Sequence, residues 1–88
     1  MVEELRSWFQ DVVSKLVTNT DAVVVEAKED EMGVLFTVRV GEGEAGKIIG
    51  KGGSVSESLR TILRAASLQR GVRGSMKIDA PPPPGGYR

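Results

Sequence analysis

The chain has 88 residues and a mass of 9.4 kDa, enough for one small domain with a single hydrophobic core. It contains neither cysteine nor histidine, which removes disulfides, thiolate metal sites and the commonest general base. These absences disfavour a catalytic triad, a zinc hydrolase and a redox enzyme. We therefore expect no enzymatic activity, no cofactor and no metal. Its apolar runs span only a few residues, far short of the roughly 20 that cross a bilayer. Since the acidic N-terminal segment does not resemble a signal peptide, the sequence predicts a small cytoplasmic binding module without membrane contact.

Charge is divided unevenly along the chain although the net charge is zero. Residues 1–44 carry ten acidic and four basic side chains, whereas residues 45–88 carry eight basic and two acidic ones. The first half therefore has a net charge of −6 and the second half a net charge of +6. This asymmetry indicates either an anionic partner for the second half or two halves that neutralise each other within one fold. Charge alone leaves both interpretations open.

The first half of the chain predicts one helix followed by a pair of strands. The polar residues 18–21 end the helix, and residues 22–28 are rich in valine, as strands are. Residues 34–40 turn every second side chain to the same face, and the turn at residues 30–33 makes the two strands a hairpin. The helix is predicted over residues 2–17 because its apolar side chains recur at helical spacing, namely Leu5, Trp8, Phe9, Val12, Val13, Leu16 and Val17.

The second half predicts two helices separated by glycines. Residues 45–49 are long enough for about a turn and a half of helix, which Gly50–Gly53 stops. Ser54 and Glu57 have the spacing of a capping box, so a longer helix is expected to begin at Ser54. Its predicted buried stripe is Val55, Leu59, Ile62, Leu63 and Ala66, with Arg60, Arg64 and Ser67 on another face.

The chain after this helix predicts a last strand and a tail. Gly71 stands in the usual position of a helix C-cap, and residues 75–79 form a short strand with Met76 and Ile78 directed inward. The resulting order is α-β-β-α-α-β, an α+β fold, and we expect one domain over residues 1–80. Residues 81–88 contain four consecutive prolines, so they are expected to form a disordered tail, either a spacer or a polyproline ligand.

Two glycine motifs match nucleotide-binding patterns but lack their context. Gly41–Gly46 fits the dinucleotide-binding G-x-G-x-x-G, yet the helix after it is cut short and no acidic residue stands about 20 positions on. Gly41–Lys47 fits the first part of a P-loop, yet Ile48 offers no hydroxyl for magnesium. Glu42 and Glu44 would repel a phosphate in either case. A nucleotide-binding enzyme is therefore the least favoured interpretation.

A third motif, Gly50-Lys51-Gly52-Gly53, suits contact with a nucleic-acid backbone. Glycines let the chain turn tightly and approach a phosphate closely. The N-terminus of the following helix offers unpaired N–H groups and a partial positive charge to the same phosphate, and Lys51 adds a mobile full charge. A plain helix–helix turn needs one glycine, so three glycines and a lysine in four positions exceed that need.

The stretch Ala45–Gly53, followed by Leu59–Ala66, resembles a KH domain, and in particular the small single-domain bacterial KH proteins of the KhpA type. The element order is similar to the type II KH arrangement, a three-stranded sheet with helices packed on one face, and the resemblance covers about residues 2–80. It implies a single-stranded RNA-binding protein, an RNA chaperone or post-transcriptional regulator, whose GxxG loop between two helices clamps the RNA backbone. Ser56 stands where many KH domains have an apolar residue, so Val55 is expected to serve instead.

The resemblance also implies a set of contacts and partners. For the apolar helical residues in this set, the alternative to RNA contact is burial in the core. For the basic residues, the alternative is exposure on a solvated helix face. No aromatic residue lies near the loop, so base stacking is not expected and affinity should be modest. The alternative function is a protein-interaction module that forms homodimers or pairs with a larger, Jag-like KhpB protein, and binding of single-stranded DNA stays open. The implied RNA-binding residues are Gly46, Lys47, Ile49, Gly50, Lys51, Gly52, Gly53, Ser54, Val55 and Arg60.

Overall fold

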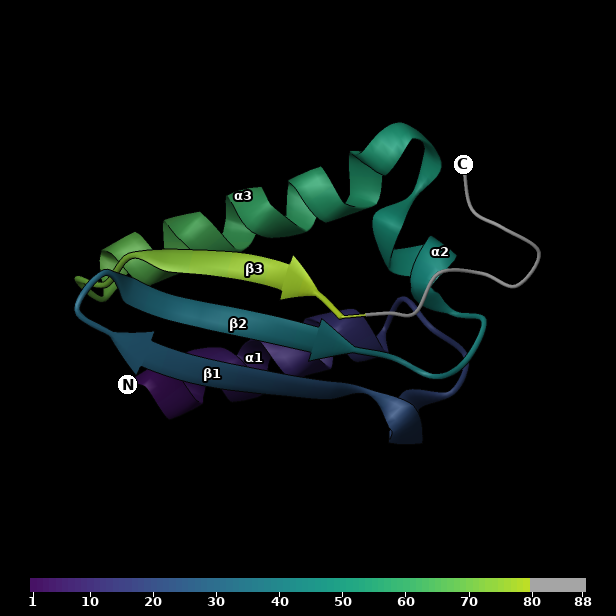
Figure 1. Ribbon diagram of the computed structural model, residues 1–88, viewed down its shortest axis with the longest axis horizontal. Coiled ribbons are helices and arrows are strands. Elements are labelled where there is room, and N and C mark those ends of the chain that lie inside the picture. Colours follow the sequence, from purple (N-terminus) through teal and green to yellow (C-terminus); the bar gives the residue numbers. More distant parts are fainter. Residues whose placement is uncertain (80–88) are drawn as a thin grey trace.

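The computed structural model describes residues 1–79 and confirms the predicted α-β-β-α-α-β order (Figure 1). The predicted tail, residues 81–88, lies outside the described part of the chain. No helix within residues 1–79 combines the length and the apolar character needed to cross a membrane. Short 3₁₀ turns at Thr20–Ala22 and Lys51–Gly53 precede β1 and α3. The helices and strands are α1 (Val2–Ser14), β1 (Val24–Asp30), β2 (Gly33–Arg39), α2 (Ala45–Ile49), α3 (Ser54–Gln69) and β3 (Gly74–Ile78).

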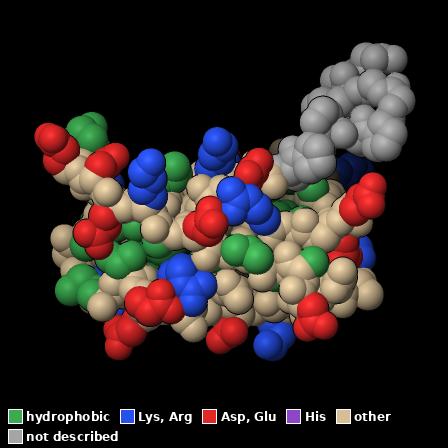
Figure 2. Space-filling view, turned by 60° about the horizontal axis from the view of Figure 1, so that its bottom comes forward, with side chains coloured by type: hydrophobic (Ala, Val, Ile, Leu, Met, Phe, Trp, Pro, Cys, Tyr) green, Lys and Arg blue, Asp and Glu red, His purple; other side chains and the backbone are tan. Residues whose placement is uncertain are grey.

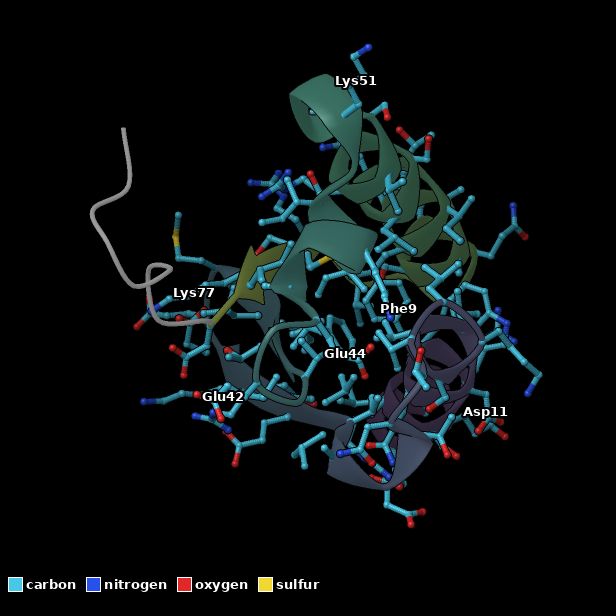
Figure 3. All side chains as sticks on the ribbon, turned by 90° about the vertical axis from the view of Figure 1, so that its right-hand side faces the viewer. Phe9, Asp11, Glu42, Glu44, Lys51 and Lys77 are labelled. Carbon is cyan, nitrogen blue, oxygen red and sulfur yellow. The ribbon has the colours of Figure 1, made fainter. Side chains whose placement is uncertain are left out.

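The three strands form one mixed sheet in the order β1-β2-β3. β1 and β2 are an antiparallel hairpin in which Ala27 pairs with Phe36, and β3 joins β2 in parallel with Met76 beside Phe36. Asp30 fixes the hairpin turn, because its Oδ1 accepts a hydrogen bond from the amide of Met32 at 2.8 Å. The helices α1 and α3 cover the same face of this sheet (Figure 1, Figure 3). This arrangement confirms the predicted three-stranded sheet with helices packed on one face.

The core lies between the sheet and the helices. Phe9 of α1 and Phe36 of β2 are fully buried, with ring centroids 6.5 Å apart. Along β2 every second side chain is buried, as the alternation predicts: Val34, Phe36 and Val38. Ile48 is the buried side chain of α2. Through these contacts the core holds α2 and α3 in place and so fixes the loop that joins them.

The first helix is shorter than the apolar pattern predicts. It ends at Ser14, whereas the pattern continues to Val17. The next residues form a turn in which Leu16 is exposed, while Val17 still packs against the core. The 3₁₀ turn Thr20–Ala22 then delays β1 to Val24, two residues after its predicted start. Apolar spacing thus identifies side chains that reach the core but not the residue at which the helix stops.

The buried stripe of α3 is rotated relative to the prediction. Leu59 and Leu63 are buried, but Ile62 is 42% exposed, and Ser67, which was expected on another face, is fully buried. The reason is a close approach between the helix and β3. A Cβ built on Gly74 would lie 2.1 Å from Ser67 Oγ, so the serine and the glycine together make room for the two backbones. Small residues, not only large apolar ones, decide which side of α3 faces the sheet.

Candidate nucleic-acid interface

The loop between α2 and α3 depends on backbone conformations that favour glycine. The φ angles of Gly50, Gly52 and Gly53 are 79°, 64° and 82°, in a region that residues with side chains rarely adopt. These three conformations fold the loop into a tight turn at the N-terminal end of α3 (Figure 1). The predicted GxxG segment is therefore a turn at the surface, not part of the core.

The glycines of this loop differ in what surrounds them. At Gly50 a Cβ would lie 2.5 Å from Cγ2 and 2.7 Å from the amide nitrogen of Val55. This glycine therefore lets the end of α2 pack directly against the start of α3. At Gly52 no atom of the described residues lies within 4 Å of the Cβ position, and at Gly53 the nearest is Ser56 Oγ at 3.9 Å. Gly50 is tightly packed, Gly53 has one neighbour at contact distance, and Gly52 faces open space.

The N-terminus of α3 corrects the predicted capping box. Gly53 is the N-cap, and Ser54 is already helical (φ −64°, ψ −39°), so its side chain does not cap the helix. Ser56 Oγ donates a hydrogen bond to the Gly53 carbonyl at 3.0 Å, and Glu57 lies near Arg60 instead of at the cap. No side chain thus caps the first-turn amides of α3. Such amides, with the positive end of the helix dipole, attract an anion.

Of the predicted basic side chains, Lys51 lies in the loop and Arg60 lies farther along α3. Lys51 is exposed and projects away from the body of the molecule (Figure 3). Within residues 1–79 it takes part in no ion pair. Arg60 lies 3.7 Å from Glu57 Oε2 with 37% of its side chain exposed. Because a long, exposed pair of this kind is weak, the Arg60 guanidinium is free to turn toward an anionic ligand.

The apolar residues predicted near the loop divide between surface and core. Ile49, at the end of α2, is 38% exposed, and Val55, which packs against Gly50, is partly buried. Gly46 is exposed and has no side chain, so the surface of α2 is low at this position. Leu59 is buried and belongs to the core. The apolar surface next to the loop therefore consists of Ile49 and Val55.

The ammonium group of Lys47 already has two hydrogen-bond partners, while its contact with RNA stays a prediction. Its Nζ donates a hydrogen bond to Glu44 Oε1 at 2.7 Å and another to Thr18 Oγ1 at 2.9 Å. Glu44 Oε1 also accepts from the amide of Thr18 at 3.1 Å, and Oε2 accepts from the amide of Asn19 at 2.7 Å. These contacts tie Lys47 to the connection between α1 and β1.

Glu44 is a functional candidate that the sequence did not single out. Its side chain is buried, and the hydrogen bond from Lys47, followed by those from Asn19 and Thr18, lowers its pKa from 4.5 to about 2. Because the carboxylate occupies these donors, residues 41–47 do not form an open phosphate-binding loop. In the sequence, nothing distinguishes Glu44 from Glu42, which lies two positions earlier and is exposed.

The ion pairs of the described residues neutralise little of the charge excess of either half. On the face shown in Figure 2, acidic and basic side chains are interspersed. Arg39 pairs with Glu26 at 2.6 Å and with Asp79, from the other half of the chain, at 3.0 Å. Lys51 stands outside these pairs among the described residues. Within residues 1–79, the ion pair that joins an acid of the first half to a base of the second is Glu44 with Lys47, and Lys51 keeps its positive charge at the loop.

Comparison with known families decides the assignment. A family model described as "KhpA/KhpB, KH domain" matches residues 7–78. That range includes the loop, the helices on either side of it and all three strands of the sheet. The chain belongs to the KhpA/KhpB family of KH domains. This membership confirms the resemblance and the fold class predicted from the sequence.

Several curated relatives carry the name "RNA-binding protein KhpA". The relative from Aquifex aeolicus is 42% identical over 64 residues, which cover 73% of this chain and 81% of that protein. The relative from Caldanaerobacter subterraneus subsp. tengcongensis is 31% identical over 67 residues, 76% of this chain and 89% of that protein. The relative from Clostridium acetobutylicum is 26% identical over 74 residues, 84% of this chain and 99% of that protein. No solved structure matches significantly. Membership in the KhpA/KhpB family confirms the prediction that the chain is not an enzyme.

Proposed function

We propose that this member of the KhpA/KhpB family is a cytoplasmic, single-stranded RNA-binding protein that clamps the RNA backbone with the loop Gly50–Gly53. In this role it acts as an RNA chaperone or post-transcriptional regulator. The relatives named above are called RNA-binding proteins, which supports the ligand class. The observation that carries the proposal is the exposed, glycine-built N-terminus of α3, whose first turn has no side-chain cap.

In the proposed complex, a phosphate is bound at the start of α3. The amides of Gly53 and Ser54 already donate to the Gly50 and Lys51 carbonyls. The remaining amides of the loop and of the first turn of α3 therefore donate to the phosphate oxygens, and Lys51 adds a full positive charge. Ile49 and Val55 contact the first base on the apolar surface beside the loop, and exposed Gly46 lets the strand approach α2. Arg60 binds a flanking phosphate. Lys47, which also bonds to Glu44, is predicted to contact a flanking phosphate.

The affinity of a single copy is expected to be modest. Within residues 1–79, the aromatic side chains lie on α1 and β2: Trp8, Phe9 and Phe36. Base stacking on aromatic rings, which contributes about 1–3 kcal/mol per base in other single-strand binders, is therefore not provided by this region. Tight binding would require a second copy on the same RNA, through effective concentration.

The experiment replaces the loop's positive charge with negative charge. Lys51→Asp combined with Gly52→Asp places two carboxylates where the phosphate would lie, and aspartate is among the residues that tolerate the left-handed conformation of Gly52. We expect binding of a fluorescein-labelled single-stranded RNA, followed by anisotropy, to be abolished. The midpoint of thermal unfolding should change little. The same titration with single-stranded DNA measures the preference for RNA.

A matched control lies at the other end of α3. Gly71 also has a positive φ, 76°, with no atom of the described residues within 4 Å of its Cβ position, and Arg73 nearby is exposed. Arg73→Asp combined with Gly71→Asp therefore makes the same chemical change and the same change of net charge away from the loop. RNA affinity should survive in this control. Equal affinity of both double variants would contradict the proposed clamp.

Association with another KH protein is the second candidate function. A shallow hollow between α1 and α3 is lined by Glu4, Leu5, Trp8, Ala66 and Arg70. Trp8 is 39% exposed there, and Ile62, one helical turn before Ala66, is 42% exposed. Apolar side chains exposed side by side favour a protein partner. The proposed partner is a second copy of this chain, with a larger, Jag-like KhpB protein as the alternative.

Sedimentation velocity with and without RNA tests this second function. Association through α1 and α3 is supported if wild type is a dimer and Ile62→Lys is a monomer. The affinity of this variant for a short RNA should be retained. A wild-type protein that sediments as a monomer at all accessible concentrations would exclude self-association. Adding the larger KH protein to that monomer then tests the alternative partner.

A further inference from the structure

The segment between β2 and α2 carries two glutamates in opposite environments. Glu42 is exposed and lies at the periphery of the molecule, whereas Glu44 points toward its centre (Figure 3). Glu44 is 7% exposed and lies directly before α2 as its N-cap residue. A carboxylate is seldom buried unless its oxygens are paired. The partners of Glu44 therefore indicate what its burial is for.

Those partners come from a segment far away in the sequence. The amides of Thr18 and Asn19, on the connection between α1 and β1, donate to Oε1 and Oε2 at 3.1 and 2.7 Å. Lys47, on the first turn of α2, donates to Oε1 at 2.7 Å and to Thr18 Oγ1 at 2.9 Å. The Lys47 amide also bonds to the Glu44 carbonyl at 3.0 Å. One side chain thus joins the start of α2 to the end of the α1 region.

This junction matters because α2 is too short to hold its own orientation. It has five residues, far fewer than an isolated helix needs in water. Ile48 anchors one side of it in the core, and Glu44 anchors its first turn. The helix ends immediately before Gly50, so any tilt of α2 is passed on to the loop.

We propose that Glu44 is a positioning residue for the RNA clamp: by bonding Thr18, Asn19 and Lys47, it holds α2 in the orientation that presents Gly50–Gly53. This inference rests on the proposed function. It also assigns Lys47 the role of fixing the Glu44 carboxylate through their hydrogen bond. When a binding-competent conformation is only partly populated, the apparent affinity falls by the populated fraction, so loosening this junction weakens RNA binding without removing any contact to RNA.

The test compares Glu44→Gln with Glu42→Gln. Both substitutions remove one negative charge from the same short segment. A glutamine at position 44 has one acceptor oxygen and an NH₂ group, so it cannot accept from both backbone amides and also pair with Lys47. If Glu44→Gln leaves about one molecule in ten in the binding-competent conformation, its affinity for the labelled single-stranded RNA should fall about tenfold. Glu42→Gln should bind as tightly as wild type or slightly more tightly.

A second measurement separates positioning from general loss of stability. In ¹H–¹⁵N spectra without RNA, the amides of Gly50, Gly52 and Gly53 should shift or broaden in Glu44→Gln. Leu63→Val, a core substitution in the middle of α3, should lower stability while leaving these loop signals and the RNA affinity in place. Glu44→Asp keeps the charge on a side chain one methylene shorter. It should show an intermediate loss of affinity, and it replaces Glu44→Gln if that variant does not fold.

The outcomes distinguish this inference from the proposed function. If a folded Glu44 variant binds RNA as tightly as Glu42→Gln with unchanged loop signals, Glu44 is not a positioning residue, and the clamp itself is unaffected. If wild type binds no RNA, or binds equally well with Lys51→Asp and Gly52→Asp, the proposed function fails and the positioning role fails with it.

Discussion

The two ends of α3 are both turns built on glycine, yet they use it differently. At the C-terminal end Gly71 has a φ of 76°, its amide donates to the Leu68 carbonyl, and the amide of Val72 donates to the Ser67 carbonyl, each at 3.0 Å. This is the Schellman arrangement, in which one glycine satisfies the last carbonyls of a helix. At the N-terminal end three glycines in four residues have positive φ, and no side chain caps the helix.

The difference supports the proposal that the N-terminal end of α3 binds a ligand. At the C-terminal end the glycine closes the helix on itself, and Gly71 performs that task alone. At the N-terminal end Gly50 performs the packing task, because it lies against Val55. Gly52 faces open space and Gly53 has only Ser56 Oγ at contact distance, so both leave the start of α3 accessible. Glycines without a packing task, next to uncapped amides, are what a closely approaching backbone requires.

The largest expected effect comes from Gly50→Ala. A methyl group there would collide with Val55, at a φ of 79° and ψ of 169° that is nearly exclusive to glycine. Strain and overpacking together are expected to lower the free energy of unfolding by about 3 kcal/mol. Urea denaturation measures this change. A loss of only a few tenths would mean that the loop repacks easily and that Gly50 has no special role.

Acid should weaken the contacts of Glu44 that support the loop at the N-terminal end of α3. The pKa of Glu44 is lowered to about 2 in the folded protein, so its carboxylate stabilises the fold fully above its ordinary pKa of 4.5. That contribution is lost as the pH falls from 4.5 toward 2. Wild type should therefore be more stable than Glu44→Gln at neutral pH, and the difference should shrink to nothing near pH 2.

Thermal unfolding at a series of pH values measures that difference. Glu42→Gln serves as the control and should follow wild type at neutral pH. A stability difference between wild type and Glu44→Gln that stays constant from pH 6 to pH 2 would contradict the role of the ionised carboxylate. The hydrogen bonds that close the C-terminal end join backbone groups, so they supply no comparable pH dependence.

A pair of alanine substitutions separates stability from binding. Gly52 and Gly71 both have left-handed φ angles and open space around the Cβ position. Gly52→Ala and Gly71→Ala should each lower the free energy of unfolding by about 1 kcal/mol, the cost of that conformation for a residue with a side chain. RNA affinity should fall several-fold for Gly52→Ala only. Equal affinities in the two variants would remove the functional distinction between the two turns.

The sequence predicts those features of the fold that follow from local patterns of side chains. Alternation on β2 identified Val34, Phe36 and Val38, and the glycine motif identified the loop as a turn between two helices. What it could not supply depends on contacts between distant segments. Ser67 is buried because it meets Gly74, and Glu44 is buried because Thr18 and Asn19 present their amides to it. Neither partner is visible from local spacing.

The candidate site divides in the same way. Lys51 and the glycines were predicted from their own chemistry, and their exposure requires only that the loop lie at the surface. Ser54 was expected to cap α3 because the spacing to Glu57 fits a capping box. The preceding glycines extend the turn to Gly53, however, so that Ser54 is already helical. A cap is set by backbone conformation, which the spacing of side chains does not determine.

The smallest expected effects come from two buried serines, one toward each end of α3. Ser56 Oγ donates to the Gly53 carbonyl at 3.0 Å, so Ser56→Ala should lower the free energy of unfolding by about 1 kcal/mol. Ser67 Oγ is buried without a hydrogen-bond partner in the described part of the chain. Ser67→Ala removes that unpaired hydroxyl while keeping the small size that Gly74 requires, so stability should stay the same or rise by up to about 1 kcal/mol.

Urea denaturation of both serine variants and wild type at one pH measures the sign of each change. Opposite signs would show that the hydroxyl near the loop stabilises the turn, while the one near Gly74 is retained only for its size. A Ser67→Ala variant destabilised as much as Ser56→Ala would mean that Ser67 has a hydrogen-bond partner in solution. The close approach of α3 to β3 would then depend on a polar contact as well as on small residues.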